Sequence, residues 1–346
     1  MTHEIYKNKG LTGLANLGNT CFVNSCIQIL SHTYELNDFL NLQTYRKKLQ
    51  KKYESALLIE WDELRTLMWS ENCVISPGKF LKTIQKLAHF KKIDIFTGYA
   101  QNDLPEFLLF VIDCFHIGLS RDVNMSISGN VENPVDSMAV KCFSMIQKMY
   151  SKEYSEIWNM FYGIHVSQII SLETGEVLSA SPEPYFMINL SIPTGNKSPS
   201  LIDCFDLYVE GEVLDGDNAW YNEATKLKQN VQKKLSYWSL PTILVIDIKR
   251  FNAQNRKNQI LLTFPLENFD LSKYVVGYKK ESYVYDLYGI CNHSGGVHGG
   301  HYTAFVKNAN GKWYEFNDTI VTEIVDTDKL ITTKAYCFFY RKKTTE

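Results

Sequence analysis

The chain has 346 residues, which is enough for about two domains or one large domain, and enough to bury a core without disulfides or metals. Its 36 Lys and Arg against 38 Asp and Glu give a net charge of -2, which argues against broad electrostatic binding to nucleic acid or to an anionic membrane. With 45% hydrophobic and 21% charged residues the composition is that of a folded protein, and no stretch approaches the ~18 apolar residues that span a bilayer.

The start of the chain and its cysteines point to a reducing compartment. The first ten residues are polar and lack the apolar stretch of a secretory signal. The eight cysteines are dispersed and form no C-x-x-C pair, which argues against a zinc knuckle and against a small disulfide scaffold. We therefore expect an intracellular protein, cytoplasmic and also nuclear, that acts as a monomer.

The first part of the chain, to about residue 155, is predicted to be mostly helical. Apolar residues recur at helical spacing in Phe22–Leu30 and again in Tyr53–Met68. Ser76-Pro77 predicts a further helix with the serine as its N-cap. Asp103–Glu106 resembles a capping-box start for the apolar run that follows, and Met138–Tyr150 is a plausible fifth helix.

After about residue 157 the pattern changes to short strands separated by Gly, Pro and Asn clusters. Helices first and strands later predict an α+β fold with two lobes, and a cleft between lobes is a natural place for a site. The predicted strands are Phe161–Ser171, Tyr185–Ile192, Thr242–Phe251, Ile260–Phe264, Tyr283–Cys291, Tyr302–Lys307, Lys312–Asn317 and Ala335–Arg341.

A cysteine at a predicted helix start is the first candidate for chemistry. The glycine-rich segment Gly10–Gln28 brings Cys21 to the first turn of the first predicted helix. The positive end of the helix dipole favours the thiolate there, which is the nucleophilic form. The amide of Asn16, five residues upstream, could donate to an oxyanion beside the sulfur. The alternative is that Cys21 is a buried small residue and that Asn19 or Thr20 merely caps the helix.

A histidine on a predicted hairpin is the second candidate. If a four-residue loop pairs Lys307 with Lys312, His301 lies opposite Asp318. If the loop has three residues, Asn317 lies opposite His301 instead. In either register an imidazole faces an acceptor side chain at about 5 Å, as in the base and orienting residue of a nucleophile triad. The sequence leaves the register open.

Simpler interpretations compete with this one. The histidines could be surface residues on a glycine-rich loop, or Cys291, His293 and His298 could bind a metal, although their spacing fits no standard ligand pattern. The basic run Arg46–Lys52 is interpreted chiefly as a solvated helix face, with a docking patch as the alternative.

Together the two candidates match the Cys-His-Asn/Asp arrangement of papain-like proteases. The segment GLANLGNTCFVNSCIQ resembles the cysteine box of the ubiquitin-specific proteases, and YDLYGICNHSGGVHGGHYTAFVKN followed by WYEFND resembles their histidine box. QNDLPEF, LPTILVIDIKRF and the later Phe264-Pro265 also match the family pattern. The resemblance covers residues 10–342.

The resemblance implies roles for five residues near the reacting centre. It makes Cys21 the nucleophile and His301 the general base. Asn317 would orient the histidine, and Asp318 is a secondary candidate for that role or for the oxyanion site. Asn16 falls on the oxyanion-hole position.

The resemblance also implies a substrate and a fold. Asp103 would contact an arginine of the ubiquitin tail, Tyr302 would wall the diglycine channel, and small residues such as Gly300 would keep it narrow. The papain-like fold would have a helical thumb (about 10–155), β fingers (about 156–238) and a palm (about 239–342).

The implied activity is that of a thiol protease that cleaves after the last glycine of ubiquitin, with ubiquitin and ubiquitinated proteins as partners and no cofactor. The fingers lack the two C-x-x-C pairs that bind zinc in many members, so we predict fingers without zinc. The alternatives are a non-catalytic ubiquitin-binding module and a protease for a ubiquitin-like modifier.

Overall fold

The computed structural model describes residues 3–98, 100–195, 198–296 and 299–344. Among them no helix is both long enough and apolar enough to cross a bilayer. The helices are α1 (Cys21–Ser31), α2 (Tyr34–Asn41), α3 (Glu54–Ser70), α4 (Gly78–Lys91), α5 (Leu104–Leu119), α6 (Pro134–Glu153), α7 (Glu156–Phe161) and α8 (Leu201–Val209).

The strands fall into one large sheet, one smaller sheet and short pairs. The first eight are β1 (Gly13–Leu14), β2 (Val74–Ile75), β3 (Gly163–Ser171), β4 (Val177–Tyr185), β5 (Met187–Ser191), β6 (Glu212–Leu214), β7 (Trp220–Asn222) and β8 (Leu227–Gln229). The others are β9 (Val231–Ser239), β10 (Ile243–Lys249), β11 (Phe269–Asp270), β12 (Val284–Gly296), β13 (Gly299–Lys307), β14 (Trp313–Asn317), β15 (Ile320–Ile324) and β16 (Ala335–Lys342).

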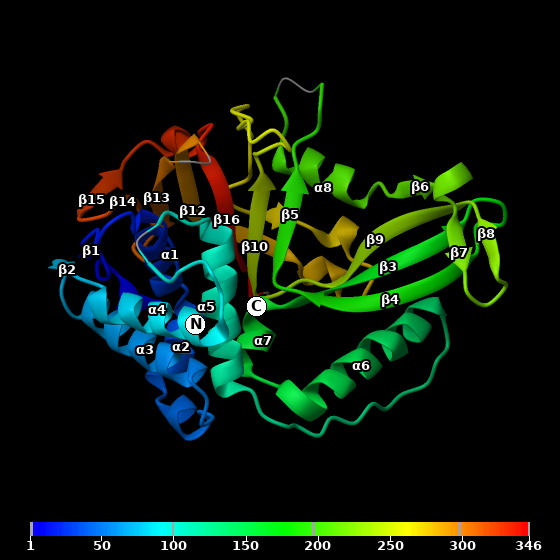
Figure 1. Cartoon of the computed structure of the whole chain (residues 1–346), viewed down its shortest axis with the longest axis horizontal. Coiled ribbons are helices and arrows are strands. Elements are labelled where there is room, and N and C mark those ends of the chain that lie inside the picture. Colours follow the sequence, from blue (N-terminus) through cyan, green and yellow to red (C-terminus); the bar gives the residue numbers. More distant parts are fainter. Residues whose placement is uncertain (1–2, 99, 196–197, 297–298, 345–346) are drawn as a thin grey trace.

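The large sheet carries the second half of the predicted site. Its order is β15-β14-β13-β12-β16-β10-β5, with β11 paired to β12. Helices α1 to α5 gather beside it, and α1 lies between α5 and the strands β12, β13 and β14 (Figure 1). Every residue of α1 is buried, because this helix packs on helices at one side and on the sheet at the other. One continuous core therefore joins the helix that begins at Cys21 to the strand that carries His301.

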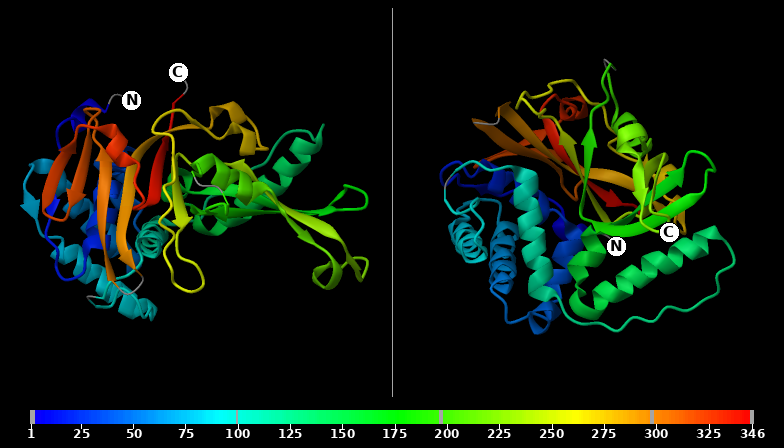
Figure 2. Two further views of the ribbon diagram at one scale, coloured as in Figure 1. Left: turned by 90° about the horizontal axis from the view of Figure 1, so that it is seen from above. Right: turned by 45° about the vertical axis from the view of Figure 1, so that its right-hand side comes forward.

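The smaller sheet has the order β4-β3-β9-β6 and extends away from the large sheet, with the β7-β8 hairpin at its far end (Figure 2). Helix α6 packs against β4, and its buried residues Ala139, Cys142 and Ile146 form a separate small core with Val166. The predicted α+β class is confirmed, with helices first and strands later.

The predicted strand at Ile260–Phe264 and the predicted Ser76 cap are both wrong. No strand forms at Ile260–Phe264, because the guanidinium of the buried Arg250 donates hydrogen bonds to the carbonyls of Asn258 and Ile260, at 3.1 and 3.0 Å. Helix α4 starts one residue later than expected, with Pro77 at the N-cap position and no side-chain cap, so the expected Ser76 cap is absent.

Candidate active site

Cys21 is the first residue of α1, at the end of a tight loop. The loop is held by the side-chain carbonyl of Asn16, which accepts hydrogen bonds from the backbone N–H of Gly18 at 3.1 Å and of Thr20 at 3.2 Å. Cys21 itself is only 2% exposed. The thiol therefore lies at the positive end of a helix dipole, where negative charge is favoured.

The amide of Asn16 is fixed at its other end by Asp318. The Asn16 Nδ2 group donates to one carboxylate oxygen of Asp318 at 2.9 Å, and the Nδ2 group of Asn24 on α1 donates to the other at 2.8 Å. Asp318 has a positive φ of 50°, and its carbonyl accepts from the N–H of Leu14 at 2.8 Å. Asp318 thus binds the loop before Cys21 and the helix after it.

His301 lies on β13 and pairs with Asn317 on β14, with 2.7 Å between Nε2 and Oδ1. A carbonyl oxygen only accepts, so the shared hydrogen lies on Nε2. In the neutral ring Nδ1 then carries the lone pair and can act as a base.

The hairpin register differs from both registers weighed above. Lys307 pairs with Trp313, so the loop has five residues, closed by a hydrogen bond from the N–H of Asn308 to the carbonyl of Lys312 at 2.9 Å. Continued along the strands, this register places His301 opposite Thr319. Asn317 is then a diagonal neighbour on the same face of the sheet, within reach of a long side chain.

Gln101, just before α5, connects the two halves of the site. Its Oε1 accepts from the N–H of Gly300 at 2.8 Å, and its Nε2 donates to the carbonyl of Gly300. The same Nε2 lies 3.7 Å from the sulfur of Cys21. One side-chain amide therefore bridges the thiol and the residue that precedes His301, although Cys21 and His301 are 280 positions apart in the chain.

Gly300 has no room for a side chain. A Cβ at this position would contact Nε2 of His293 and would lie 2.6 Å from the carbonyl oxygen of Ser294. At Gly299 a Cβ would meet nothing within 4 Å. The close approach of the two strands at Gly300 therefore requires glycine.

Asp103 lies beside this bridge, in the wall of a cavity of about 330 Å³ that Tyr302, Tyr336 and His293 also line. The expected capping box is absent: the Asp103 carboxylate makes no cap bond and instead accepts from the hydroxyls of Tyr302 at 3.0 Å and Tyr336 at 3.2 Å. Burial raises the pKa of Asp103, and the two hydroxyls oppose that rise. The cavity thus has an acidic, partly desolvated wall beside Gln101, the residue that contacts the sulfur.

The structure describes two of the three residues of the metal hypothesis. Cys291 is buried in the core, whereas the ring of His293 faces Lys257, whose Nζ lies 3.1 Å from Nδ1. Burial and then the Lys257 charge lower the pKa of His293 to about 4, so this imidazole is neutral at pH 7. His298 lies outside the described residues, and among the described ones no group of three or more His, Cys, Asp and Glu could hold a metal.

Two residues of this arrangement were not singled out from the sequence. Gln101 stands in a quoted segment but received no role. Asn24 is a buried amide on α1, three positions after Cys21, and such a residue needs a hydrogen-bond partner. That requirement is the signal that could have identified it.

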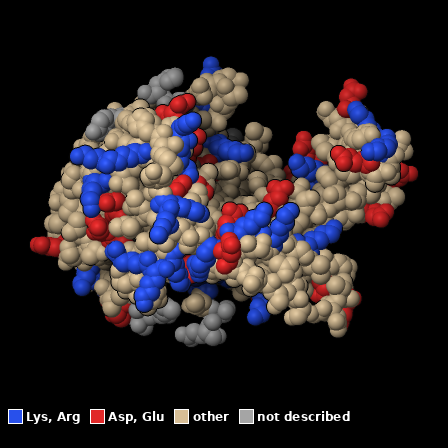
Figure 3. Space-filling view, turned by 60° about the horizontal axis from the view of Figure 1, so that its bottom comes forward, with Lys and Arg blue, Asp and Glu red and all other residues tan. Residues whose placement is uncertain are grey.

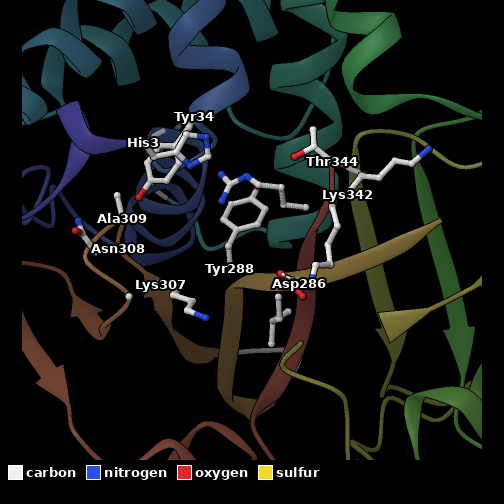
Figure 4. Close-up of a pocket in the computed structure, with 13 residues that line it drawn as sticks. His3, Tyr34, Asp286, Tyr288, Lys307, Asn308, Ala309, Lys342 and Thr344 are labelled. Carbon is white, nitrogen blue, oxygen red and sulfur yellow. Dashed lines mark ion pairs between the residues drawn. The ribbon is translucent and has the colours of Figure 1, made fainter. Parts of the chain in front are cut away.

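A second cavity, of about 360 Å³, is lined by none of the predicted site residues (Figure 4). In it the guanidinium of Arg341 lies 4.6 Å from the ring centre of Tyr34 and 4.4 Å from that of Tyr288, and it donates to Glu35 at 2.7 Å. These contacts join β16 to α2, so the cluster has a structural role.

Comparison with known proteins gives a consistent result. A family model described as "Ubiquitin carboxyl-terminal hydrolase" matches residues 12–340. Human "Ubiquitin carboxyl-terminal hydrolase 2" is 35% identical over 345 residues, which cover 96% of this chain and 55% of that protein. Human "Ubiquitin carboxyl-terminal hydrolase 21" is 29% identical over 362 residues, which cover 98% of this chain and 63% of that protein. The chain thus spans a little over half the length of these relatives.

Among solved structures, a SAGA DUB module of Ubp8, Sgf11, Sus1 and Sgf73 bound to monoubiquitin matches with a TM-score of 0.74 and 24% identity, over 99% of this chain and 71% of that one. The same kind of module bound to ubiquitin aldehyde also gives a TM-score of 0.74, at 22% identity, over 99% and 71% of the two chains. At this identity the likeness concerns the fold alone.

Proposed function

Because the chain belongs to the ubiquitin carboxyl-terminal hydrolase family, we propose that it is a deubiquitinating cysteine protease that cleaves the isopeptide or peptide bond after the C-terminal glycine of ubiquitin. The observation that carries the proposal is the Gln101 bridge, which holds the sulfur of Cys21 beside the strand of His301. The pairing of His301 with Asn317 supplies the orienting group that a base needs.

In the proposed reaction His301 takes the proton of the Cys21 thiol, and the resulting thiolate attacks the carbonyl carbon of the last glycine, so that a carbon–sulfur bond forms. The Asn16 amide and the Cys21 N–H donate to the oxyanion, where one such donor contributes about 3 kcal/mol. His301 protonates the departing lysine amine as the carbon–nitrogen bond breaks. It then takes a proton from water, whose oxygen displaces sulfur and releases ubiquitin with a free carboxylate.

The neighbouring residues have supporting roles in this proposal. Asn317 orients His301, and Asp318 orients Asn16, which fits its two hydrogen bonds to Asn16 and Asn24 better than a direct role beside the imidazole. Asp103 contacts an arginine of the ubiquitin tail, with Tyr302 and Gly300 walling the diglycine channel. The partly desolvated carboxylate of Asp103 suits a cationic group.

The remaining features of the proposal concern the domain and its setting. We propose a single catalytic domain over residues 10–342, with a thumb to about 155, zinc-less fingers to about 238 and a palm beyond. Ubiquitin and ubiquitinated proteins are the partners, no cofactor takes part, and the protein works as a monomer in the cytoplasm and nucleus. The eight cysteines are all unpaired, which suits a reducing compartment.

The test is hydrolysis of a fluorogenic ubiquitin amide by the wild type and by Cys21→Ala. Cys73→Ala is the matched control, because Cys73 is the exposed cysteine and lies outside the site. We expect turnover by the wild type and the control, and none by Cys21→Ala. Equal rates in all three would end the proposal, and ubiquitin binding without hydrolysis by the wild type would identify a non-catalytic module.

A further inference from the structure

An exposed aromatic pair lies where the start of α3 meets the end of α4. Tyr53 is 65% exposed and Phe90 is 56% exposed, and their ring centres are 4.0 Å apart. Single exposed apolar residues are ordinary, whereas two large exposed rings in mutual contact form a small contiguous apolar patch.

Lysines surround this pair. Lys82 and Lys86 precede Phe90 on α4 by eight and four positions, so they lie along the same face of the helix. Together these residues form what we call the α3–α4 patch: Lys51, Lys52, Tyr53, Lys82, Lys86, Phe90, Lys91 and Lys92. Figure 3 shows Lys and Arg side chains gathered on the left part of the face drawn, which the amino-terminal helices form.

The fold accounts for some of these lysines but not for all. Lys91 pairs with the mostly buried Glu54 at 2.9 Å, and Lys52 donates to Ser120 at 3.0 Å. Lys91 and Lys92 also lie at the C-terminus of α4, where cations stabilise the helix dipole. Lys51 and Lys86 are exposed, lie outside that last turn and form no ion pair within the described residues.

Lys92 occupies a backbone position that favours glycine. It is the C-cap of α4, with a left-handed φ of 55°. A side chain other than Gly or Asn costs about 1 kcal/mol in that conformation. A lysine here therefore adds charge to the patch at a cost in stability.

Acidic groups limit the extent of the patch. Asp113 lies 4.0 Å from Lys91 on the side of α5, and Glu60 and Glu63 hold Lys79 at the other end of α4. Along α4 the patch runs from Lys82 to Phe90, eight residues of helix or about 12 Å, which is the length of roughly four residues of extended chain. The positive surface is thus short and local.

We propose that the α3–α4 patch binds a short acidic polypeptide segment that carries a bulky apolar side chain. The lysines would pair with its carboxylates, and the Tyr53–Phe90 pair would contact the apolar side chain. A nucleic acid fits less well, because its backbone would extend past the acidic boundary and because the two rings already contact each other where bases would stack.

The patch is separate from the candidate active site. Helix α5 begins beside Asp103 and ends just before Ser120, which contacts Lys52 of the patch. Its 16 residues span about 24 Å. The bound segment would therefore belong to a partner protein and would leave the cavity at Asp103 open, so this proposal does not depend on the chemistry at Cys21.

The test is fluorescence polarisation with a labelled twelve-residue probe peptide of Glu and Asp around one Trp. We expect saturable binding to the wild type that weakens with added salt, and at least fivefold weaker binding when the Trp is replaced by Gly. The double variant Lys86→Glu/Lys92→Glu should lose at least tenfold in affinity, and so should Phe90→Ser.

The matched control is Lys279→Glu/Lys280→Glu. It makes the same charge change at exposed lysines elsewhere, and Lys279 has a φ of 51°, like Lys92. The control should bind the peptide like the wild type. All variants should stay folded, with melting temperatures within a few degrees of the wild type, and should keep hydrolysis of the ubiquitin amide. The neutral Lys86→Gln variant provides a milder change and should still weaken binding measurably.

Three results would overturn the proposal. One is no saturable binding of the peptide to the wild type. Another is equal binding by Lys86→Gln, Phe90→Ser and the control. The third is binding of a single-stranded oligonucleotide or of vesicles of anionic phospholipid, sensitive to the same variants, in place of the peptide.

Discussion

Removing the Asp318 side chain should damage catalysis more than it damages the fold. Asp318→Gly deletes both hydrogen bonds that its carboxylate accepts from the amides of Asn16 and Asn24. Glycine is the right replacement because the native φ of 50° suits it, whereas alanine would add backbone strain of about 1 kcal/mol. The change thus removes the side chain without adding backbone strain.

The expected loss of activity follows from the proposed role of the Asn16 amide as an oxyanion donor. A single oxyanion donor is worth about 3 kcal/mol, or roughly a hundredfold in rate. Asn16 keeps the hydrogen bonds to its own loop, so we expect a partial loss, with kcat falling about 10- to 100-fold and KM changing little. Two hydrogen bonds to a charged, partly exposed group contribute at most a few kcal/mol to the free energy of unfolding. The relief of backbone strain in the glycine variant offsets part of their loss.

The assay is steady-state hydrolysis of a fluorogenic ubiquitin amide, with melting temperature as the check on folding. Lys279→Gly is the control, because Lys279 is exposed and has a similar φ of 51°. In an Asn16→Ala background Asp318→Gly should cause little further loss, since both changes remove the same donor. A folded Asp318→Gly variant whose kcat stays within twofold of the wild type would refute the reasoning.

Three other substitutions test separate parts of the structure. Gly300→Ala should abolish hydrolysis and lower the melting temperature, whereas Gly299→Ala should do neither. Gln101→Ala should speed alkylation of Cys21 by iodoacetamide, followed by intact mass, and an unchanged rate would show that other atoms cover the sulfur. Burial raises the pKa of Asp247 to about 7. Ionisation of this carboxyl therefore favours the unfolded chain, and the resulting loss of folding stability grows from pH ~4 to pH 7. Asp247→Asn should therefore raise the melting temperature above pH 7 and not below pH 4.

Local patterns predicted the parts of the fold whose spacing is regular. The helix that starts at Cys21 and the strand of His301 were both predicted, because apolar periodicity and turn residues act over short distances. Strand β4 was not predicted, since Pro182 and Pro184 argue against a strand. They are tolerated because β4 lies at the edge of its sheet.

Contacts between distant segments explain the other differences. The hairpin loop has five residues because the Asn308 side chain is held by the N-terminal segment, accepting from Asn8 and donating to Lys9. Asp103 was expected to cap a helix, but its carboxylate instead accepts hydrogen bonds from two tyrosines that lie 199 and 233 positions later. No local pattern carries such information, which is also why Gln101 received no role.

The most direct test of the central claim is where a ubiquitin vinyl-sulfone probe attaches. Peptide mass spectrometry of the wild type should find the adduct on Cys21 alone, and His301→Ala should react much more slowly while keeping its fold. An adduct on another cysteine, or no adduct on the folded wild type, would contradict the assignment of Cys21 as a nucleophile served by His301.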